Sequence, residues 1–398
     1  MAARRTLPLL VALWVTLVHG QNYQPVNVTT TILLDGGGTA EVRAYPVYVD
    51  PATPYVMAGS GGSLQVFDTN GNQVSSLAGQ FDVFAVANGV DFGGQGGTLV
   101  ATGSFETGTC GGQRCLRVFR WDPVGGFQNL DFTNTTVNVM AAMTLDATNA
   151  PTFAIYYASV GPSGFQPVYR QDISIGADGG ITFLATNQTN RTLPINTLFG
   201  MAAFAGSTLF VTSDNGPLDA FPTDLTNLDG GVFFPLGSIG ELDGISLVPI
   251  DGGQSIIAGD KTKNAVMFID TQSAVFQGGL SIVAPLNDGG HRTVVPHGAA
   301  ATPGPALLVV TEPATPGVPE IASNAAVYLA PFTFPDAGGG GGGPDGGGGG
   351  GGIPTIPSIP PGPGAVPPNS YGCSSASGVP LLVTFLIPLL LPRRRRRR

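Results

Sequence analysis

The hydrophobic pattern of the chain consists of short apolar runs separated by turns rich in Gly, Asn, Asp and Pro. The stretch LQVFD (64–68) is one such run, and an Asn-Gly turn follows it. Comparable stretches, each an apolar run ending in an acid or a turn, occur at 116–122, 167–172, 218–224, 264–270 and 325–332. Because copies of one strand pattern recur at a spacing of roughly 50 residues, the pattern predicts a repeated β-sheet unit.

Every copy is preceded by two further apolar runs, and five copies are followed by one more. The expected first strands are 44–50, 82–91, 137–145, 196–204, 243–249 and 291–296. The expected second strands are 55–60, 98–104, 153–159, 208–214, 255–260 and 306–312. The expected outer strands are 73–79, 127–132, 181–186, 231–237 and 276–283.

The sixth unit has no outer strand of its own after Phe332, and the N-terminal segment 27–34 is expected to supply it and so close a ring. Groups of four short strands with this period are typical of an all-β fold, the six-bladed β-propeller. A β-sandwich is the competing architecture, but it does not repeat its strand order six times.

Both ends of the chain differ from this repeated region. Residues 1–20 have two arginines, an apolar run and a small residue before Gln21, as in a secretory signal peptide; a membrane anchor is the alternative. Residues 21–335 form the expected propeller, and 336–370 form a Gly- and Pro-rich linker without core-forming residues. Residues 371–398 combine a short apolar run with six terminal arginines, which suggests a C-terminal anchor segment.

The net charge of the expected propeller restricts the classes of ligand that it is expected to bind. The region 21–335 contains nine basic and 24 acidic residues, a formal charge near −15. This excess of negative charge disfavours nucleic acid and favours cations, although acidity also serves solubility in secreted proteins.

Three cysteines are present in the chain. Cys110 and Cys115 flank a GGQR stretch, and in an oxidising exterior they are expected to close a loop as a disulfide. A zinc site is disfavoured because no second cysteine pair or nearby histidine accompanies them.

The strand order from 47 to 72, together with the later segments 198–214, 240–270 and 286–312, resembles the phytase-like β-propellers. The resemblance covers most of 40–332. It implies an acidic channel that holds Ca²⁺ ions and hydrolyses phosphate monoesters, with carboxylates as metal ligands.

Transferred residue by residue, the resemblance places candidate calcium ligands at Glu241, Asp243, Asp260, Asp82, Asp214, Asp288 and Glu312. Candidate phosphate or ligand contacts are Arg292, His291, Lys261 and Lys263; a simple loop contact is the alternative for the His291–Arg292 pair. At several other positions this sequence lacks the charged residue of the family. Phe199 and Phe204 stand where the family has acids, and Ser104-Phe105 replaces an Asn-Arg pair. No GxSxG elbow is present, so no serine hydrolase is expected.

The last 28 residues resemble the bacterial C-terminal sorting signals called MYXO-CTERM. The similarity rests on Gly372-Cys373-Ser374, the short apolar run and the arginine cluster. It implies processing near Cys373 and retention of a secreted protein at a bacterial cell surface, with the cell envelope as partner. A plain tail anchor is the alternative.

Two functions from different classes remain open at this point. The first is a catalytically degenerate propeller that binds a protein, glycan or phosphate-ester ligand. The second is a calcium-dependent, 3-phytase-like phosphomonoester hydrolase with a reduced metal site.

Overall fold

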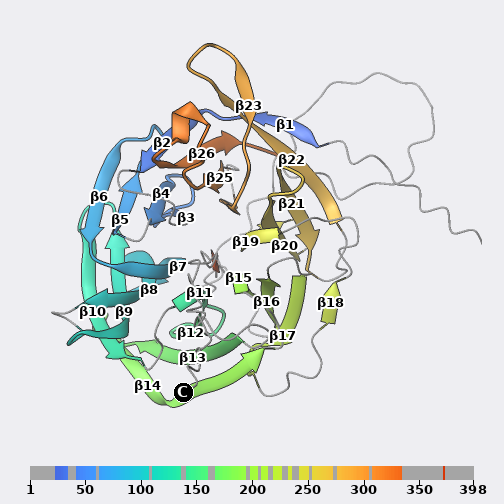
Figure 1. The fold of residues 1–398 in the computed structure, drawn as a ribbon. Coiled ribbons are helices and arrows are strands. Elements are labelled where there is room, and N and C mark those ends of the chain that lie inside the picture. Colours follow the sequence, from blue (N-terminus) through green and yellow to red (C-terminus); the bar gives the residue numbers. More distant parts are fainter. Residues whose placement is uncertain are drawn as a thin grey trace, which may run out of the picture.

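The computed structural model describes residues 23–34, 42–59, 62–106, 110–135, 140–159, 166–193, 198–204, 208–213, 218–225, 232–234, 242–250, 253–271, 276–303, 307–333 and 371–372. These residues are almost entirely β-strands, arranged as sheets around a common centre (Figure 1). The single helical element among them is the short 3-10 helix η1 (Pro319–Ile321).

The sheets are the six blades of a β-propeller. Each blade is an antiparallel sheet whose first strand lies nearest the centre of the ring (Figure 1). The first three blades are β3 (Arg43–Val47), β4 (Tyr55–Gly59), β5 (Ser63–Phe67) and β6 (Gln73–Ala78); β7 (Phe81–Asp91), β8 (Gly96–Glu106), β9 (Gln113–Asp122) and β10 (Gly126–Asn134); and β11 (Met140–Asp146), β12 (Thr152–Ser159), β13 (Gln166–Ile175) and β14 (Ile181–Leu193).

The last three blades follow the same order. They are β15 (Leu198–Phe204), β16 (Thr208–Ser213), β17 (Leu218–Pro222) and β18 (Val232–Phe234); β19 (Leu242–Ile250), β20 (Gly253–Asp260), β21 (Ala265–Asp270) and β22 (Phe276–Pro285); and β24 (Gly298–Ala301), β25 (Leu307–Glu312), β26 (Ala325–Pro331) and β2 (Thr30–Leu34). A bridge between Gly244 and Gly298 joins the fifth and sixth blades, and β1 (Gln24–Asn27) adds to the outer strand β22 of the fifth.

The ring closes through the N-terminal strand β2, as the sequence predicted. This strand pairs antiparallel with β26, in a register that places Thr30 opposite Leu329 and Leu34 opposite Ala325. Ile32 and Leu34 are buried, while Thr31 and Leu33 are exposed, so the side chains of β2 alternate between the core and solvent. The sixth blade therefore contains strands from both ends of the described propeller, because β2 near the N-terminus pairs with β26.

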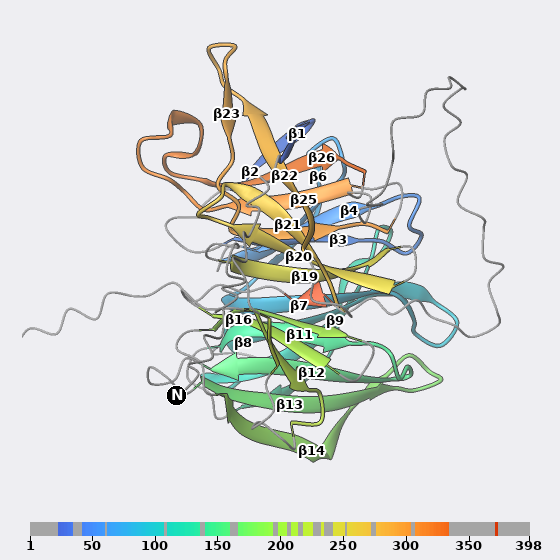
Figure 2. The same cartoon turned by 90° about the vertical axis from the view of Figure 1, so that its right-hand side faces the viewer.

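The innermost strand of the sixth blade differs from the prediction. The sequence pattern favoured 291–296, but Gly298–Ala301 occupies that position and pairs with β25. Residues His291–Thr293 form β23, which pairs with β22 and extends with its turn away from the ring (Figure 2). The four small residues of β24 fit the crowded centre, where Gly298 approaches Gly244, whereas a strand containing His291 and Arg292 would bury a charge there.

The hydrophobic core lies between blades. The buried apolar residues form six clusters, and each cluster is shared by two successive blades, including the pair formed by the sixth and first. This arrangement follows from the second strands, which are buried on both faces because a blade packs against a neighbour on either side.

The recurring Asp at the end of a third strand closes a turn. Asp68 accepts hydrogen bonds from the backbone N–H groups of Asn70 (2.9 Å) and Asn72 (2.8 Å), and Gly71 has a φ of +89°. Asp122 binds Val124 and Gly125 in the same way. These aspartates are therefore turn residues, as expected for residues of this type in hairpins.

The disulfide between Cys110 and Cys115 is confirmed. Near the centre of the ring, the two-residue strand β27 (Tyr371–Gly372) pairs with Val86 and Ala85 of β7. The expected signal peptide, linker and remainder of the tail, including Cys373, lie outside the described residues. Within the described ranges, no helix is long and apolar enough to cross a membrane.

Candidate functional site

The propeller topology gathers most of the candidate carboxylates on one face of the ring. In each blade the start of the first strand pairs with the end of the second, as in Leu242 with Asp260 and Gly298 with Thr311. Asp82 and Asp243 lie at the start of first strands, and Asp260 and Glu312 at the end of second strands. These positions are up to 230 residues apart in the sequence, and they lie on the same face of the ring because every blade has the same strand order.

Both oxygens of the Glu312 carboxylate accept hydrogen bonds from the protein. It is 1% exposed, and its Oε1 and Oε2 accept hydrogen bonds from Nη1 (3.0 Å) and Nη2 (2.6 Å) of Arg292. The hydroxyl of Tyr328 donates to Oε2 (2.9 Å), and the backbone N–H of Val295 donates to Oε1 (3.1 Å). A bidentate guanidinium–carboxylate pair of this kind is strong and directional.

Arg292 thus joins the segment after the fifth blade to the sixth blade. Its guanidinium also lies 5.7 Å from the centroid of the Tyr328 ring and donates to the Tyr328 hydroxyl. The sequence raised Arg292 as a ligand contact and Glu312 as a metal ligand, and the structure brings these two residues into one ion pair.

Asp260 lies at the end of β20, is fully buried (0% exposed) and accepts a hydrogen bond from the backbone N–H of Lys263 at 2.9 Å. Its carboxylate therefore stabilises the turn that carries Lys261, which is half-buried, and Lys263, which is exposed. The pKa of the Tyr23 hydroxyl is raised by burial and by the negative charge of Asp260.

Asp288 and His291 belong to the exposed turn between β22 and β23. The backbone N–H of Gly290 donates to Oδ1 of Asp288 at 2.9 Å, and Gly289 takes the left-handed conformation with φ of +84°. His291 is exposed at the start of β23. The hairpin formed by β22 and β23 projects from the ring (Figure 2).

The remaining candidates are not placed by the described residues. Glu241 and Asp214 lie outside them, and of Asp82 and Asp243 only the backbone is described. Within the ranges that the structure describes, no three His, Cys, Asp or Glu side chains are close enough to hold a metal ion together.

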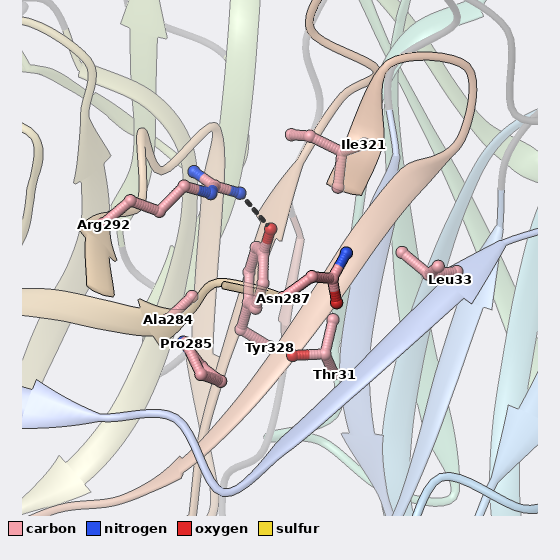
Figure 3. A pocket seen from close by; sticks show the side chains of 8 residues that line it. All are labelled: Thr31, Leu33, Ala284, Pro285, Asn287, Arg292, Ile321 and Tyr328. Carbon is pink, nitrogen blue, oxygen red and sulfur yellow. Dashed lines mark hydrogen bonds between the residues drawn. The ribbon is translucent and has the colours of Figure 1, made fainter. Parts of the chain in front are cut away.

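A pocket of about 290 Å³ lies beside the Arg292–Glu312 pair, between the outer parts of the fifth and sixth blades (Figure 3). Its lining residues come from β2, the end of β22, the turn that follows it, β23, η1 and β26: Thr31, Leu33, Ala284, Pro285, Asn287, Arg292, Ile321 and Tyr328. Sequence reasoning missed Thr31, Leu33 and Tyr328 as site residues, because the lining is assembled from segments up to about 300 residues apart.

Another buried acid was also missed. Asp219 on β17 is 2% exposed, and within the described part of the chain its Oδ1 has no hydrogen-bond partner. Burial raises the pKa of this carboxyl from 3.8 to about 6. The only sequence signal was a charged residue in the otherwise apolar strand LDAFP.

The arrangement of strands and the packing between sheets define the protein as a six-bladed β-propeller. Comparison with solved structures finds a luciferin-regenerating enzyme, at 12% identity and a TM-score of 0.45, with 76% of this chain and 95% of that chain covered. A second similar structure is BBS1N in complex with ARL6DN, at 10% identity and a TM-score of 0.41, with 71% and 76% covered. No protein-family model matches the chain, and the search of curated proteins finds no match. Matches this weak carry no argument about function, which therefore depends on the residues described above.

Proposed function

We propose that this chain is a secreted propeller, held at a bacterial cell surface by its C-terminal segment, and that it acts as a catalytically degenerate binding module. The proposal of secretion and retention rests on the signal-peptide pattern of residues 1–20 and on the Gly372-Cys373-Ser374 motif with its apolar and arginine-rich sequel.

One observation carries the choice of a binding module. Both carboxylate oxygens of Glu312 are taken up by donors of the protein itself, namely Arg292, Tyr328 and the backbone of Val295. A calcium site needs six to eight oxygen ligands that converge on one point, and a carboxylate bound in this way is a poor contributor to it. Asp260 and Asp288 likewise stabilise turns of the protein.

A calcium-dependent phosphomonoester hydrolase is the second candidate, and one observation favours it. The register of the fifth blade pairs Leu242 with Asp260, so the backbone of Asp243 starts its strand next to the end of β20. A reduced metal site there would include Asp243 and the neighbouring Glu241 in the family's acidic segment.

The discriminating experiment measures phosphate release from phytate by the purified chain, with Ca²⁺ and with a chelator. The binding-module proposal predicts no calcium-dependent release and no rise in melting temperature on adding Ca²⁺. The variant Glu241→Ala/Asp243→Ala is compared with the wild type. Calcium-dependent release that this variant loses would overturn the proposal and establish the hydrolase.

Retention is tested separately by cell fractionation. The proposal predicts a surface-fraction protein that has lost the terminal arginines. A surface-fraction protein that still carries Arg393–Arg398 would contradict processing near Cys373 and support a plain tail anchor.

A further inference from the structure

We propose that the pocket between the fifth and sixth blades binds an uncharged carbohydrate, and specifically one terminal sugar residue of a glycan. This inference rests on the proposed binding function and names the ligand class and the site. The argument uses the charge of the pocket, the hydrogen-bonding groups at its rim and its size.

The pocket is electrically balanced. Arg292 is the one ionised side chain among the eight lining residues, and its two Nη groups are bound to the carboxylate of Glu312 at 3.0 and 2.6 Å. The positive charge is therefore neutralised within hydrogen-bonding distance. A phosphate or carboxylate ligand would gain little from Arg292 and would be repelled by Glu312, so a neutral ligand is favoured.

Two polar side chains of the lining remain available to such a ligand. The hydroxyl of Thr31 on β2 and the carboxamide of Asn287 after β22 both line the pocket, and neither makes a hydrogen bond with the described part of the protein. In Figure 3 the Thr31 and Asn287 side chains lie on the same side of the Tyr328 ring. A hydroxyl and a carboxamide each offer both a donor and an acceptor, which matches the hydroxyl groups of a sugar.

Apolar side chains complete the lining. Leu33, Ile321, Ala284 and Pro285 surround the polar groups, and Leu33 is 46% exposed at the rim. A sugar ring combines C–H faces with hydroxyl groups at its edge, so it suits a lining of this mixed character. The volume of about 290 Å³ is at the small end of ligand pockets, and it suits one ring better than an extended peptide.

The experiment uses the purified full chain and a named set of probes. Saturation-transfer NMR followed by titration calorimetry is carried out with D-glucose, D-mannose, N-acetyl-D-glucosamine and their disaccharides. Inorganic phosphate and the peptide Gly-Ala-Gly-Ala serve as probes of the competing ligand classes. We expect at least one neutral sugar to bind and the other two classes to bind more weakly.

Two pocket variants locate the binding. Thr31→Val and Asn287→Ala each remove a hydrogen-bonding group from an exposed residue, so the fold is expected to survive. Each variant should weaken sugar binding by about three- to tenfold, as expected for the loss of one hydrogen bond. Thr133→Val on the outer strand β10 and Asn149→Ala in the turn before β12 are matched controls that should leave the affinity unchanged.

The inference is overturned if no neutral sugar binds, or if sugar binding is insensitive to both pocket variants. It is also overturned if phosphate or the peptide binds more tightly than any sugar and the pocket variants weaken that binding. The binding-module proposal is tested separately from the sugar site. Calcium-dependent phosphate release from phytate would contradict the binding-module proposal. Binding of the chain to isolated cell envelopes without such release would support it.

Discussion

Replacing Asp219 by Asn tests whether a buried carboxylate on β17 lowers the stability of the propeller. Asp219 is almost completely buried on β17, and its Oδ1 accepts no hydrogen bond from the residues that the structure describes. Burial disfavours the charged form and raises the pKa of the carboxyl from 3.8 to about 6. At pH 7 the folded protein therefore holds an ionised group in a poorly solvated place.

The magnitude follows from the change in pKa. Each pKa unit corresponds to about 1.4 kcal/mol, so the shift sets an upper bound of about 3 kcal/mol for the destabilisation at pH 7. Relaxation of the site and partial access of water reduce such penalties, and we expect about 2 kcal/mol. Asn has nearly the same shape without the charge, although its amide also loses some solvation on burial.

The sign of the pH dependence is the sharper test. Because the folded pKa lies above the unfolded one, the folded state binds more protons between about pH 4 and pH 6. The contribution of Asp219 to stability therefore falls as pH rises through this window, and the full penalty is present above about pH 6. Asp219→Asn should consequently gain stability relative to the wild type as the pH rises from 4 to 7.5.

The assay is urea unfolding, followed by circular dichroism, at several pH values between 4 and 7.5. Asp68→Asn is an informative control because the hydrogen bonds from Asn72 lower the pKa of Asp68. Its stabilising contribution is lost only as the pH falls below about 4, so between pH 4 and 7.5 the stability difference between Asp68→Asn and the wild type should stay nearly constant. Parallel stability curves for wild type and Asp219→Asn across the whole range would refute the reasoning.

Three further predictions concern the ion pair, the disulfide and the closing strand. Glu312→Gln should lower the free energy of unfolding by about 3 kcal/mol in urea at pH 7, because it leaves a largely buried guanidinium without its counter-charge; a change below 0.5 kcal/mol would contradict a structural role for the pair. Cys110→Ser/Cys115→Ser should lower the free energy of unfolding by about 2 kcal/mol, because the disulfide closes only a short loop in the unfolded chain. A reducing agent should lower the melting temperature of the wild type but not of the variant. Ile32→Ala should lower the free energy of unfolding by about 3 kcal/mol, whereas Leu33→Ala, at the exposed neighbouring position, should lower it by less than about 1 kcal/mol. Equal effects of the two substitutions would show that β2 does not close the ring as described.

The repeated strand pattern was enough to predict most of the propeller. Leu64–Phe67 and its five counterparts are third strands, and the segment 27–34 contains the strand that completes the sixth blade. These predictions succeed because a strand that packs between two blades must be apolar on both faces, and that requirement is visible in the sequence. The disulfide was predicted for a similarly local reason, since Cys110 and Cys115 are only five positions apart.

The error in the sixth blade has an identifiable cause. His291–Thr293 is followed by two valines and looks like a strand, whereas Gly298–Ala301 consists of residues that are poor strand formers by propensity. The centre of the ring reverses this preference because β24 pairs there with the inner strand of the fifth blade, through the bridge between Gly298 and Gly244. Intrinsic propensity describes an isolated strand, whereas packing against the neighbouring blade determines which residues form β24.

The candidate site was predicted only in part. The family resemblance marked Glu312 as a candidate metal ligand, and the His291–Arg292 pair was considered separately as a phosphate or ligand contact. The pairing of Glu312 with Arg292 depends on where β23 leaves the fifth blade and where β25 ends in the sixth, and no local pattern encodes that distance. Tyr328 was visible only as an apolar position in a strand, although its hydroxyl completes the cluster.

The sequence by itself determined the all-β class, the number of repeated units, the closing strand and the disulfide, because each depends on periodicity or on residues close together in the chain. Only the tertiary structure decided which strand lines the centre, that Glu312 is neutralised by Arg292, and that Thr31 and Asn287 meet at one pocket. The physical reason is the ring itself. Closing it brings β2 against β26 and the fifth blade against the sixth, and it creates contacts between residues that are separated by most of the chain.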